Sequence, residues 1–354
     1  MPLKLPNPHI EQMEEDILYH LALGTKTHDL KAMFGDIKFV VLGGSPRRME
    51  MFAYYMLEQI GCVLPTGQTL TNIAGKTDRY VLFKVGPVLI VSHGMGIPSI
   101  QIVLHEIIKL VHHAQCTGVL FFRIGTCGGL GMSPVDNVSN MPSVTHTSHG
   151  IGNGSCSIVL HEVLKMLRYA EATQDVMIMR MGTCGGIGLP PGSVVVSNST
   201  VDGLFKPYLE MAILGKVVKR PSYLDKELVE DLMSCAQDDD GFKTVRGKTM
   251  CTLDFYEGQA RLDGAFCDYT EKDKINFLKR ANEEGVCNIE MESLCFAAMC
   301  HHANIKGAVV CVTILDRLQG DQVSTPHDTL KAWDQRPATI VARLIRKKLG
   351  LDKK

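Results

Sequence analysis

The sequence predicts an α/β fold: a single domain with one mixed central β-sheet flanked by helices. Short apolar strands alternate with segments of helical spacing, and several of the strands run directly into glycines that open the next helix. Ligands of such sheets bind at the carboxyl ends of the strands. We therefore expect the functional residues near these glycine-rich turns.

The elements alternate along the whole chain. The predicted strands cover residues 39–42, 85–91, 119–124, 193–197, 244–251 and 308–313. The predicted helices cover residues 10–23, 101–113, 226–235, 272–284, 294–300 and 332–349. Glycine-rich turns follow the first three strands: GGSP at 43–46, SHGMG at 92–96 and GTCGG at 125–129.

Composition excludes several classes of protein. The 354 residues are 45% hydrophobic and carry a formal net charge of −1, which favours neither nucleic acid nor an anionic membrane as partner. The apolar stretches are strand-length, too short to span a bilayer. The twelve cysteines are scattered without CxxC pairs, and the N-terminal residues lack the apolar core of a secretion signal. We therefore expect a cytoplasmic protein with reduced thiols and no metal site.

One segment occurs twice. SHGMGIPSIQIVLHE at 92–106 matches SHGIGNGSCSIVLHE at 148–162 at ten of fifteen positions, and RIGTCGGLG at 123–131 matches RMGTCGGIG at 180–188 at seven of nine. We call residues 92–147 the first repeat and residues 148–200 the second repeat. Two copies are too few for a solenoid. We favour a tandem duplication, or a join of two alternative versions of one segment, over a second functional pocket.

Arginines and glycines near three turns predict an anion site. In GGSPRR, Gly44 lets the backbone approach an anion, and Arg48 can grip two of its oxygens. Arg123 ends an apolar strand, where a charge normally has an anionic partner, and Thr126 follows it. Arg79 lies in TDRY. The alternatives are a tight turn for the glycines, and surface charges for Arg48 and Arg79.

Two further motifs offer polar groups for a small ligand. In FYEGQAR at 255–261, the Gln259 amide and the Arg261 guanidinium fit the alternating acceptor and donor edge of uracil, although a plain polar loop is the alternative. In NIEMES at 288–293, Glu292 can accept two ribose hydroxyls and Met291 offers an apolar surface. The acids there could equally stabilise a helix N-terminus. Asp316 and Arg317 follow a strand, where a lid or base contact could lie.

Taken together, these motifs resemble the animal uridine phosphorylases of the nucleoside phosphorylase family. The resemblance rests on EEDILYHL, GDIKFVVLGGSPRRM, TDRY, VGPVLIVSHGMGIPSI, RIGTCGG, GKTMCTLDFYEGQARLDGA, NIEMES and QRP, and it runs from about residue 6 to the C-terminus apart from the extra repeat. It implies a nucleoside phosphorylase-like fold and the reversible phosphorolysis of uridine, with deoxyuridine as a further candidate, to uracil and ribose 1-phosphate in pyrimidine salvage and nucleotide catabolism. No cofactor is implied, because inorganic phosphate is a co-substrate.

The resemblance also implies a role for each motif. Catalysis would rest on Arg48, Gln259 and Arg261. The implied phosphate-binding residues are Gly44, Arg48, Arg79, Arg123 and Thr126, with Arg180 and Thr183 as the alternative copy; the uracil-binding residues are Phe255, Gln259 and Arg261; and the ribose-binding residues are His20, Glu290, Met291 and Glu292. His20 and Arg79 would come from the neighbouring subunit, which implies a homodimer or larger homo-oligomer with shared active sites. His20 could instead be an ordinary charge at a helix C-terminus.

The chain departs from the family at the repeats, because the family has one copy. The first repeat keeps the family's IPS at 97–99, whereas the second repeat runs on into the family's continuation at 188–196. Both cannot fill one position in a sheet, so one copy is extruded or an extra helix–strand pair is added. We favour the second repeat in the core. A phosphorylase of other nucleoside specificity, a hydrolase and a catalytically impaired nucleoside-binding paralogue remain as alternatives.

Overall fold

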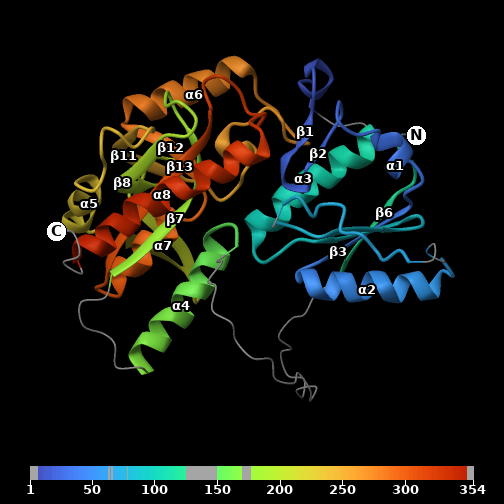
Figure 1. The fold of residues 1–354 in the computed structure, drawn as a ribbon, viewed down its shortest axis with the longest axis horizontal. Coiled ribbons are helices and arrows are strands. Elements are labelled where there is room, and N and C mark those ends of the chain that lie inside the picture. Colours follow the sequence, from blue (N-terminus) through green and yellow to red (C-terminus); the bar gives the residue numbers. More distant parts are fainter. Residues whose placement is uncertain are drawn as a thin grey trace.

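The computed structural model describes residues 7–124, 150–169 and 177–348, apart from positions 63, 65, 66 and 78. Strands and helices alternate in this part of the chain, and the predicted α/β class is confirmed. The elements form an N-terminal group and a C-terminal group, drawn on the right and the left of Figure 1, with the two chain ends on opposite sides. None of the helices in the described ranges is long and apolar enough to cross a bilayer.

The N-terminal group is a four-stranded sheet with a helix on each face. The strand order is β4 (Leu82–Val85), β5 (Val88–Ser92), β3 (Phe39–Gly43), β6 (Leu120–Ile124), with only β4 antiparallel to its neighbour. Alternate residues of β3 face opposite sides. Val41 packs with Met49 and Ala53 of α2 (Pro46–Gln59), whereas Val40 packs with Ile102 and other residues of α3 (Ile97–His113).

Shorter elements complete this group. They are the 3₁₀ turns η1 (Ile10–Gln12) and η2 (Tyr19–Leu21), the paired strands β1 (Ile17–Leu18) and β2 (Leu23–Gly24), and α1 (Leu30–Phe34). The predicted helix at 10–23 is therefore wrong. Its turn ends at Met13, whose backbone is extended, and Ala22 has a positive φ of 55°. The apolar spacing there serves separate short contacts with the core, and tertiary packing overrides helical propensity.

The C-terminal group is a closed barrel with mixed strand directions. Its strands follow the order β11 (Thr244–Cys251), β12 (Val286–Glu290), β7 (Met177–Gly186), β13 (Lys306–Asp316), β8 (Val194–Val201). The flanking helices are α4 (Asn153–Tyr169), α5 (Lys226–Met233), α6 (Glu271–Glu283), α7 (Ser293–His302) and α8 (His327–Lys348); η3 (Glu257–Gln259) and the hairpin of β9 (Tyr208–Ile213) and β10 (Lys216–Pro221) complete it. Ala308 to Val312 of β13 are fully buried, as a strand covered on both faces requires.

The strands thus lie in two main sheets, where the sequence predicted one central sheet. Each repeat supplies a helix followed by a strand, α3 and β6 in the first and α4 and β7 in the second, and the second repeat continues into β8. β6 pairs with β3, and β7 pairs with β13 along its whole length. A β-strand can form hydrogen bonds along both of its edges, so a single copy of this strand could pair with β3 and β13 at once. With two copies present, β3 pairs with β6 and β13 pairs with β7.

The two repeats meet where their helices begin. Gly96 and Gly152, which precede α3 and α4, both have a φ near +90°, a conformation that glycine adopts without strain. The Ser155 hydroxyl donates a hydrogen bond to the Met95 carbonyl at 3.3 Å, and a Cβ at Gly152 would lie 2.5 Å from Pro98. The N-terminal and C-terminal groups therefore contact each other through these two turns.

Close approach of β11 and β12 gives a stability prediction. A Cβ added at Gly247 would lie 1.7 Å from the Cys287 sulfur and 3.1 Å from its Cβ, so Gly247→Ala displaces the Cys287 side chain from its place beside β11. We expect the free energy of unfolding to fall by about 1–3 kcal/mol in denaturant titrations. Cys287→Ala alone is the control, and adding it to Gly247→Ala should recover most of the loss. Equal stability of Gly247→Ala and the unmodified protein would contradict this packing.

Candidate active site

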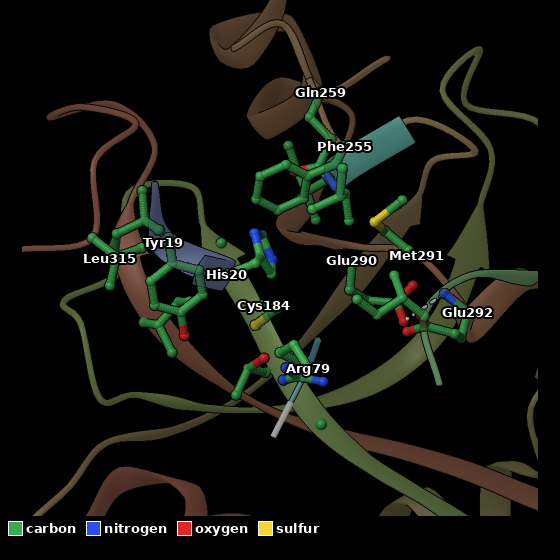
Figure 2. A pocket seen from close by; sticks show the side chains of 18 of the residues that line it. Tyr19, His20, Arg79, Cys184, Phe255, Gln259, Glu290, Met291, Glu292 and Leu315 are labelled. Atoms are coloured by element: carbon green, nitrogen blue, oxygen red, sulfur yellow. Dashed lines mark hydrogen bonds between the residues drawn. The ribbon is translucent and has the colours of Figure 1, made fainter. Parts of the chain in front are cut away.

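A cavity of about 380 Å³ lies between the two groups of elements. The N-terminal group contributes Tyr19, His20, Arg79 and Ile102; the second repeat contributes Gly150, Ile151 and residues 180–185; the barrel contributes residues 289–292, 314 and 315, with Phe255, Gln259, Arg261, Arg317, Val323 and Asp334. Figure 2 shows Phe255 and Gln259 on one side, Glu290, Met291 and Glu292 on a second side, and Arg79 away from Gln259. Most of the predicted site residues thus meet in one cavity.

Phe255, Gln259 and Arg261 form one end of the cavity. The Arg261 guanidinium lies 4.3 Å from the centre of the Phe255 ring, and its Nε and Nη2 donate hydrogen bonds to the Asp263 carboxylate at 2.9 and 2.8 Å. Arg317 donates to the Gln259 backbone carbonyl at 2.8 Å and to its side-chain Oε1 at 3.4 Å. Neighbouring charges therefore fix both the guanidinium and the amide in place.

A buried ionic network supports this end. Asp321 accepts hydrogen bonds from Arg317 Nε and the Leu262 N–H at 3.0 and 2.9 Å, and Lys274 Nζ lies 3.0 Å from the same carboxylate. Burial raises the pKa of Asp321, but Arg317, Arg261 and Lys274 outweigh burial and lower it to about 2. Burial lowers the pKa of Arg261, but the carboxylates of Asp263 and Asp321 outweigh burial and raise the pKa above its ordinary value. Arg261 is therefore always charged.

Arg180 organises the opposite end. This guanidinium on β7 is only 6% exposed and lies 3.0 Å from Glu290, and it also pairs with Glu292. Burial lowers its pKa, but the two carboxylates outweigh burial and hold the pKa well above its ordinary value. The other Glu292 oxygen accepts the Gly152 N–H. Both carboxylate oxygens of Glu292 are therefore engaged by groups of the protein itself.

Glu290 has a different environment from Glu292. Its carboxylate accepts the N–H groups of Glu292 and Ser293 at 3.0 and 2.9 Å and the Ser293 hydroxyl at 2.5 Å, all at the start of α7. This matches the helix-terminus alternative considered for the NIEMES acids. Met291 packs on the core of the N-terminal sheet.

His20 is held by a carboxylate that the sequence interpretation missed. Glu106 Oε1 lies 2.7 Å from His20 Nδ1, and the Glu106 carboxylate accepts the backbone N–H groups of His20 and Leu21 at 3.0 Å. The His20 ring meets the Phe255 ring edge-on at 5.0 Å between centres. The sequence did contain a sign of this pairing, because Glu106 lies among apolar residues such as Ile102 and Ile107 on the buried face of α3. A buried carboxylate needs a partner.

The predicted phosphate residues are divided between two places. Arg79, Arg180 and Thr183 line the cavity, whereas Gly44 and Arg48 are absent from its lining. The Arg48 side chain is exposed on the first turn of α2, and a Cβ at Gly44 would lie 3.3 Å from the Gly94 carbonyl of the first repeat. The Arg123 backbone pairs with Leu42, and Thr126 lies outside the described residues.

His20 and Arg79 line the cavity of their own chain in this structure. The resemblance had assigned both to a neighbouring subunit. Gly44 lies against the first repeat, on the same side of the molecule as Arg48. The residues predicted to bind uracil and ribose share the cavity with the second repeat.

The profile of the phosphorylase superfamily matches residues 38–138 and 140–346, and the chain belongs to this superfamily. Uridine phosphorylase 2 of Homo sapiens is 46% identical over 345 residues, 98% of this chain and 90% of the relative. Uridine phosphorylase 1 of Mus musculus is 47% identical, covering 98% and 93%. Within the superfamily, the chain therefore belongs with the animal-type uridine phosphorylases.

Two proteins of Schistosoma mansoni are also similar. Inactive uridine phosphorylase B is 31% identical, with 98% of this chain and 96% of the relative covered. The crystal structure of uridine phosphorylase in complex with uracil is 33% identical, with 97% of this chain and 99% of that chain covered and a TM-score of 0.47.

The ionic network predicts a pH dependence of stability. The folded-state pKa of Asp321 lies below its ordinary value of 3.8, so its contribution is present above that pH and is lost as the pH falls toward about 2. We expect Asp321→Asn to lower the free energy of unfolding by about 3 kcal/mol near neutral pH, because it leaves buried cations without their partner. The difference from the unmodified protein should shrink in acid.

Asp238→Asn is the matched control, because Asp238 is exposed. Denaturant titrations at several pH values measure both variants. A deficit for Asp321→Asn that stays constant down to the acid limit would contradict the network.

Proposed function

We propose that this chain catalyses the reversible phosphorolysis of uridine to uracil and ribose 1-phosphate, with deoxyuridine as a further candidate substrate. The observation that carries the proposal is one cavity with an amide and a guanidinium at one end and a buried arginine beside a carboxylate at the other. The 46–47% identity to uridine phosphorylases over nearly the whole chain supports the same substrate class.

Gln259 and Arg261 are the proposed contacts of the base. An amide offers a donor and an acceptor, and a guanidinium offers only donors, so the pair can read the N–H and carbonyl edge of uracil. Phe255, in contact with the Arg261 guanidinium, supplies an apolar ring beside the base. As the glycosidic bond breaks, negative charge grows on uracil, and the fixed cation of Arg261 stabilises it.

Glu292 and Met291 are the proposed contacts of the ribose, with His20 at the sugar's far side and Glu290 in a supporting position. A carboxylate suits the ribose diol, because it accepts two hydrogen bonds. Both Glu292 oxygens already have partners, Gly152 and Arg180. A bound ribose therefore competes with these two groups, and a phosphate that draws Arg180 away frees Glu292 for the sugar.

Phosphate is the proposed nucleophile, held by Arg79, Arg180 and Thr183 in the cavity, with Gly44, Arg48, Arg123 and Thr126 as the other candidate ligands. Phosphate is already an anion, so no general base is required. Positioning it below the anomeric carbon converts a bimolecular encounter into an oriented one. The sugar acquires oxocarbenium character as the base leaves, and the phosphate oxygen then bonds to the anomeric carbon.

A catalytically impaired nucleoside-binding protein is the second candidate. It is favoured by the absence of Gly44 and Arg48 from the lining of the cavity, and a relative of similar length carries "inactive" in its name.

We also infer that the repeats arose by tandem duplication, supported by their sequence identity and by a helix–strand unit in each. We further propose a homodimer or larger homo-oligomer, as the resemblance to the animal uridine phosphorylases implies, and a cytoplasmic location, which the scattered cysteines without CxxC pairs favour.

Uracil release tests the proposal directly. We expect release from uridine to require inorganic phosphate and to exceed base release from inosine. Release that persists in full without phosphate would indicate a hydrolase and overturn the proposal. Calorimetry with uridine separates the second candidate, because binding without phosphate-dependent release identifies a nucleoside-binding protein.

Substitutions at the base end give a further prediction. Arg261→Ala and Gln259→Leu should each lower the rate of uracil release by about 10²-fold or more, because each removes a donor to the leaving base. Arg168→Ala and Gln237→Leu are matched controls, since both side chains are exposed and neither residue lines the cavity. Unchanged rates for both base-end variants would refute the assignment.

A further inference from the structure

The two repeats share the sequence VLHE, at 103–106 in α3 and at 159–162 in α4. The glutamates of the two copies differ in burial. The Glu106 side chain is 2% exposed, whereas the Glu162 side chain is 66% exposed and lies 2.8 Å from Lys165 on the helix surface. An exposed ion pair contributes little to stability, whereas a buried carboxylate needs partners. The copy on α3 therefore has a role that the copy on α4 does not share.

Four donors converge on the Glu106 carboxylate. Oε1 accepts the His20 N–H at 3.0 Å and lies 2.7 Å from His20 Nδ1, and Oε2 accepts the Leu21 N–H at 3.0 Å. The Tyr256 hydroxyl lies 3.5 Å from Oε1. Burial raises the pKa of Tyr256, and the Glu106 charge raises it further, so this hydroxyl keeps its proton. Glu106 is therefore the acceptor towards all four groups.

These contacts determine which ring nitrogen of His20 carries the proton. Because the carboxylate accepts, Nδ1 donates, and in the neutral imidazole Nε2 is then left as an acceptor. His20 lines the cavity, and within the described ranges the hydrogen bonds of its ring involve Nδ1 alone. The Phe255 ring meets the His20 ring edge-on at 5.0 Å between centres and limits its rotation (Figure 2). His20 thus offers one acceptor in a fixed orientation.

The same buried side of α3 supports the loop that carries the proposed base contacts. His105 Nδ1 accepts the Ala265 N–H at 2.8 Å. Lys109 donates to the Asp263 carbonyl, also at 2.8 Å. Both of these α3 side chains are buried, as Glu106 is. One helix therefore fixes the histidine and the base end of the cavity relative to each other.

We propose that Glu106 is a positioning residue for the phosphorolysis of uridine, which fixes His20 so that Nε2 accepts a hydrogen bond from a ribose hydroxyl. The proposal deepens the function proposed above and rests on the ribose role given there to His20. Glu106 and His20 both belong to the N-terminal group, so they reach the sugar as one unit. Because the ring is ordered before the sugar binds, binding does not bear that cost. Uracil lacks the sugar and does not use this contact.

Calorimetry with the full chain tests the contact with the sugar. Glu106→Gln sets an amide donor against one of the N–H groups that the carboxylate accepts, so the His20 ring loses its fixed orientation. We expect uridine binding to weaken about 10-fold, the effect of losing one hydrogen bond, and uracil binding to stay unchanged. Glu162→Gln, the same change in the exposed copy, is the matched control and should alter neither affinity. Unchanged uridine binding by Glu106→Gln, or equal losses for uridine and uracil, would overturn the proposal.

A double-mutant cycle tests whether Glu106 acts through His20. We expect His20→Ala to lower kcat/KM for uridine by about 10–100-fold, and Glu106→Gln to lower it by no more than that. The double variant should be no slower than His20→Ala alone, because two residues that act through one contact are not additive. Losses that multiply in the double variant would show that Glu106 acts by another route and would contradict the positioning role.

NMR of the unmodified protein, labelled at its histidine ring nitrogens, shows the tautomer directly near neutral pH. The signals missing from the spectrum of His20→Ala identify His20. We expect a proton on Nδ1 and none on Nε2, and a proton on Nε2 would overturn the proposal. Circular dichroism checks the folding of each variant. Should Glu106→Gln not fold, Glu106→Asp, which keeps the charge but shortens the reach, takes its place in the binding test.

The positioning role and the proposed function fail differently. A chain that releases no uracil in the presence of phosphate contradicts the function, whereas a selective loss of uridine binding in Glu106→Gln still supports the contact. An active chain whose Glu106→Gln variant binds and cleaves uridine normally contradicts the positioning role alone. A chain that binds no uridine contradicts both.

Discussion

A single buried guanidinium holds the site together. Arg180 extends from β7 of the barrel and pairs with Glu290 and Glu292, which lie just before the start of α7. Isolated buried charges are costly, so the strand, the helix and the turn at Gly152, whose N–H Glu292 accepts, depend on one another. The same guanidinium is a buried cation in the lining of the cavity. Under the proposed function, the fold and the phosphate would compete for this one group.

The other end of the cavity is built differently. Arg261, Arg317 and Lys274 share Asp263 and Asp321 and form a network that requires no ligand. The Gln259 backbone and side chain are tied to this network through Arg317. The side chains proposed to contact the base are therefore held in place by the protein itself. Glu292, the proposed ribose contact, would instead have to exchange partners to accept a sugar. Under the proposed function, this asymmetry places the cost of binding on the sugar and the phosphate.

Local sequence signals located the strands and turns well. The predicted strands at 39–42 and 119–124 were confirmed, because continuous apolar runs with glycines at their ends have few alternatives. The strand predicted at 85–91 begins only at Val88, because β4 ends at Val85 and the chain turns at Gly86, which has a positive φ of 51°. The helix at 10–23 was wrong, because its spacing reflects contacts of η2 and β2 with α3 and not a helical face. His20 was identified, but not its partner Glu106, since the pairing joins residues distant in sequence. The strands form two sheets because β6 pairs with β3 and β7 pairs with β13. Which partner each strand takes is decided by contacts between distant parts of the chain, and the local sequence does not indicate it.

The first repeat has Pro98 where the second has Gly154, and this looks like erosion when the two are aligned. In the folded chain, Gly152 already lies against the Pro98 ring, and a Cβ at Gly154 would come within 3.7 Å of Gly96. The tight contact is at Gly152, where any side chain would overlap the Pro98 ring. The absence of a side chain at this one position therefore lets the turn before α4 pack directly against the turn before α3.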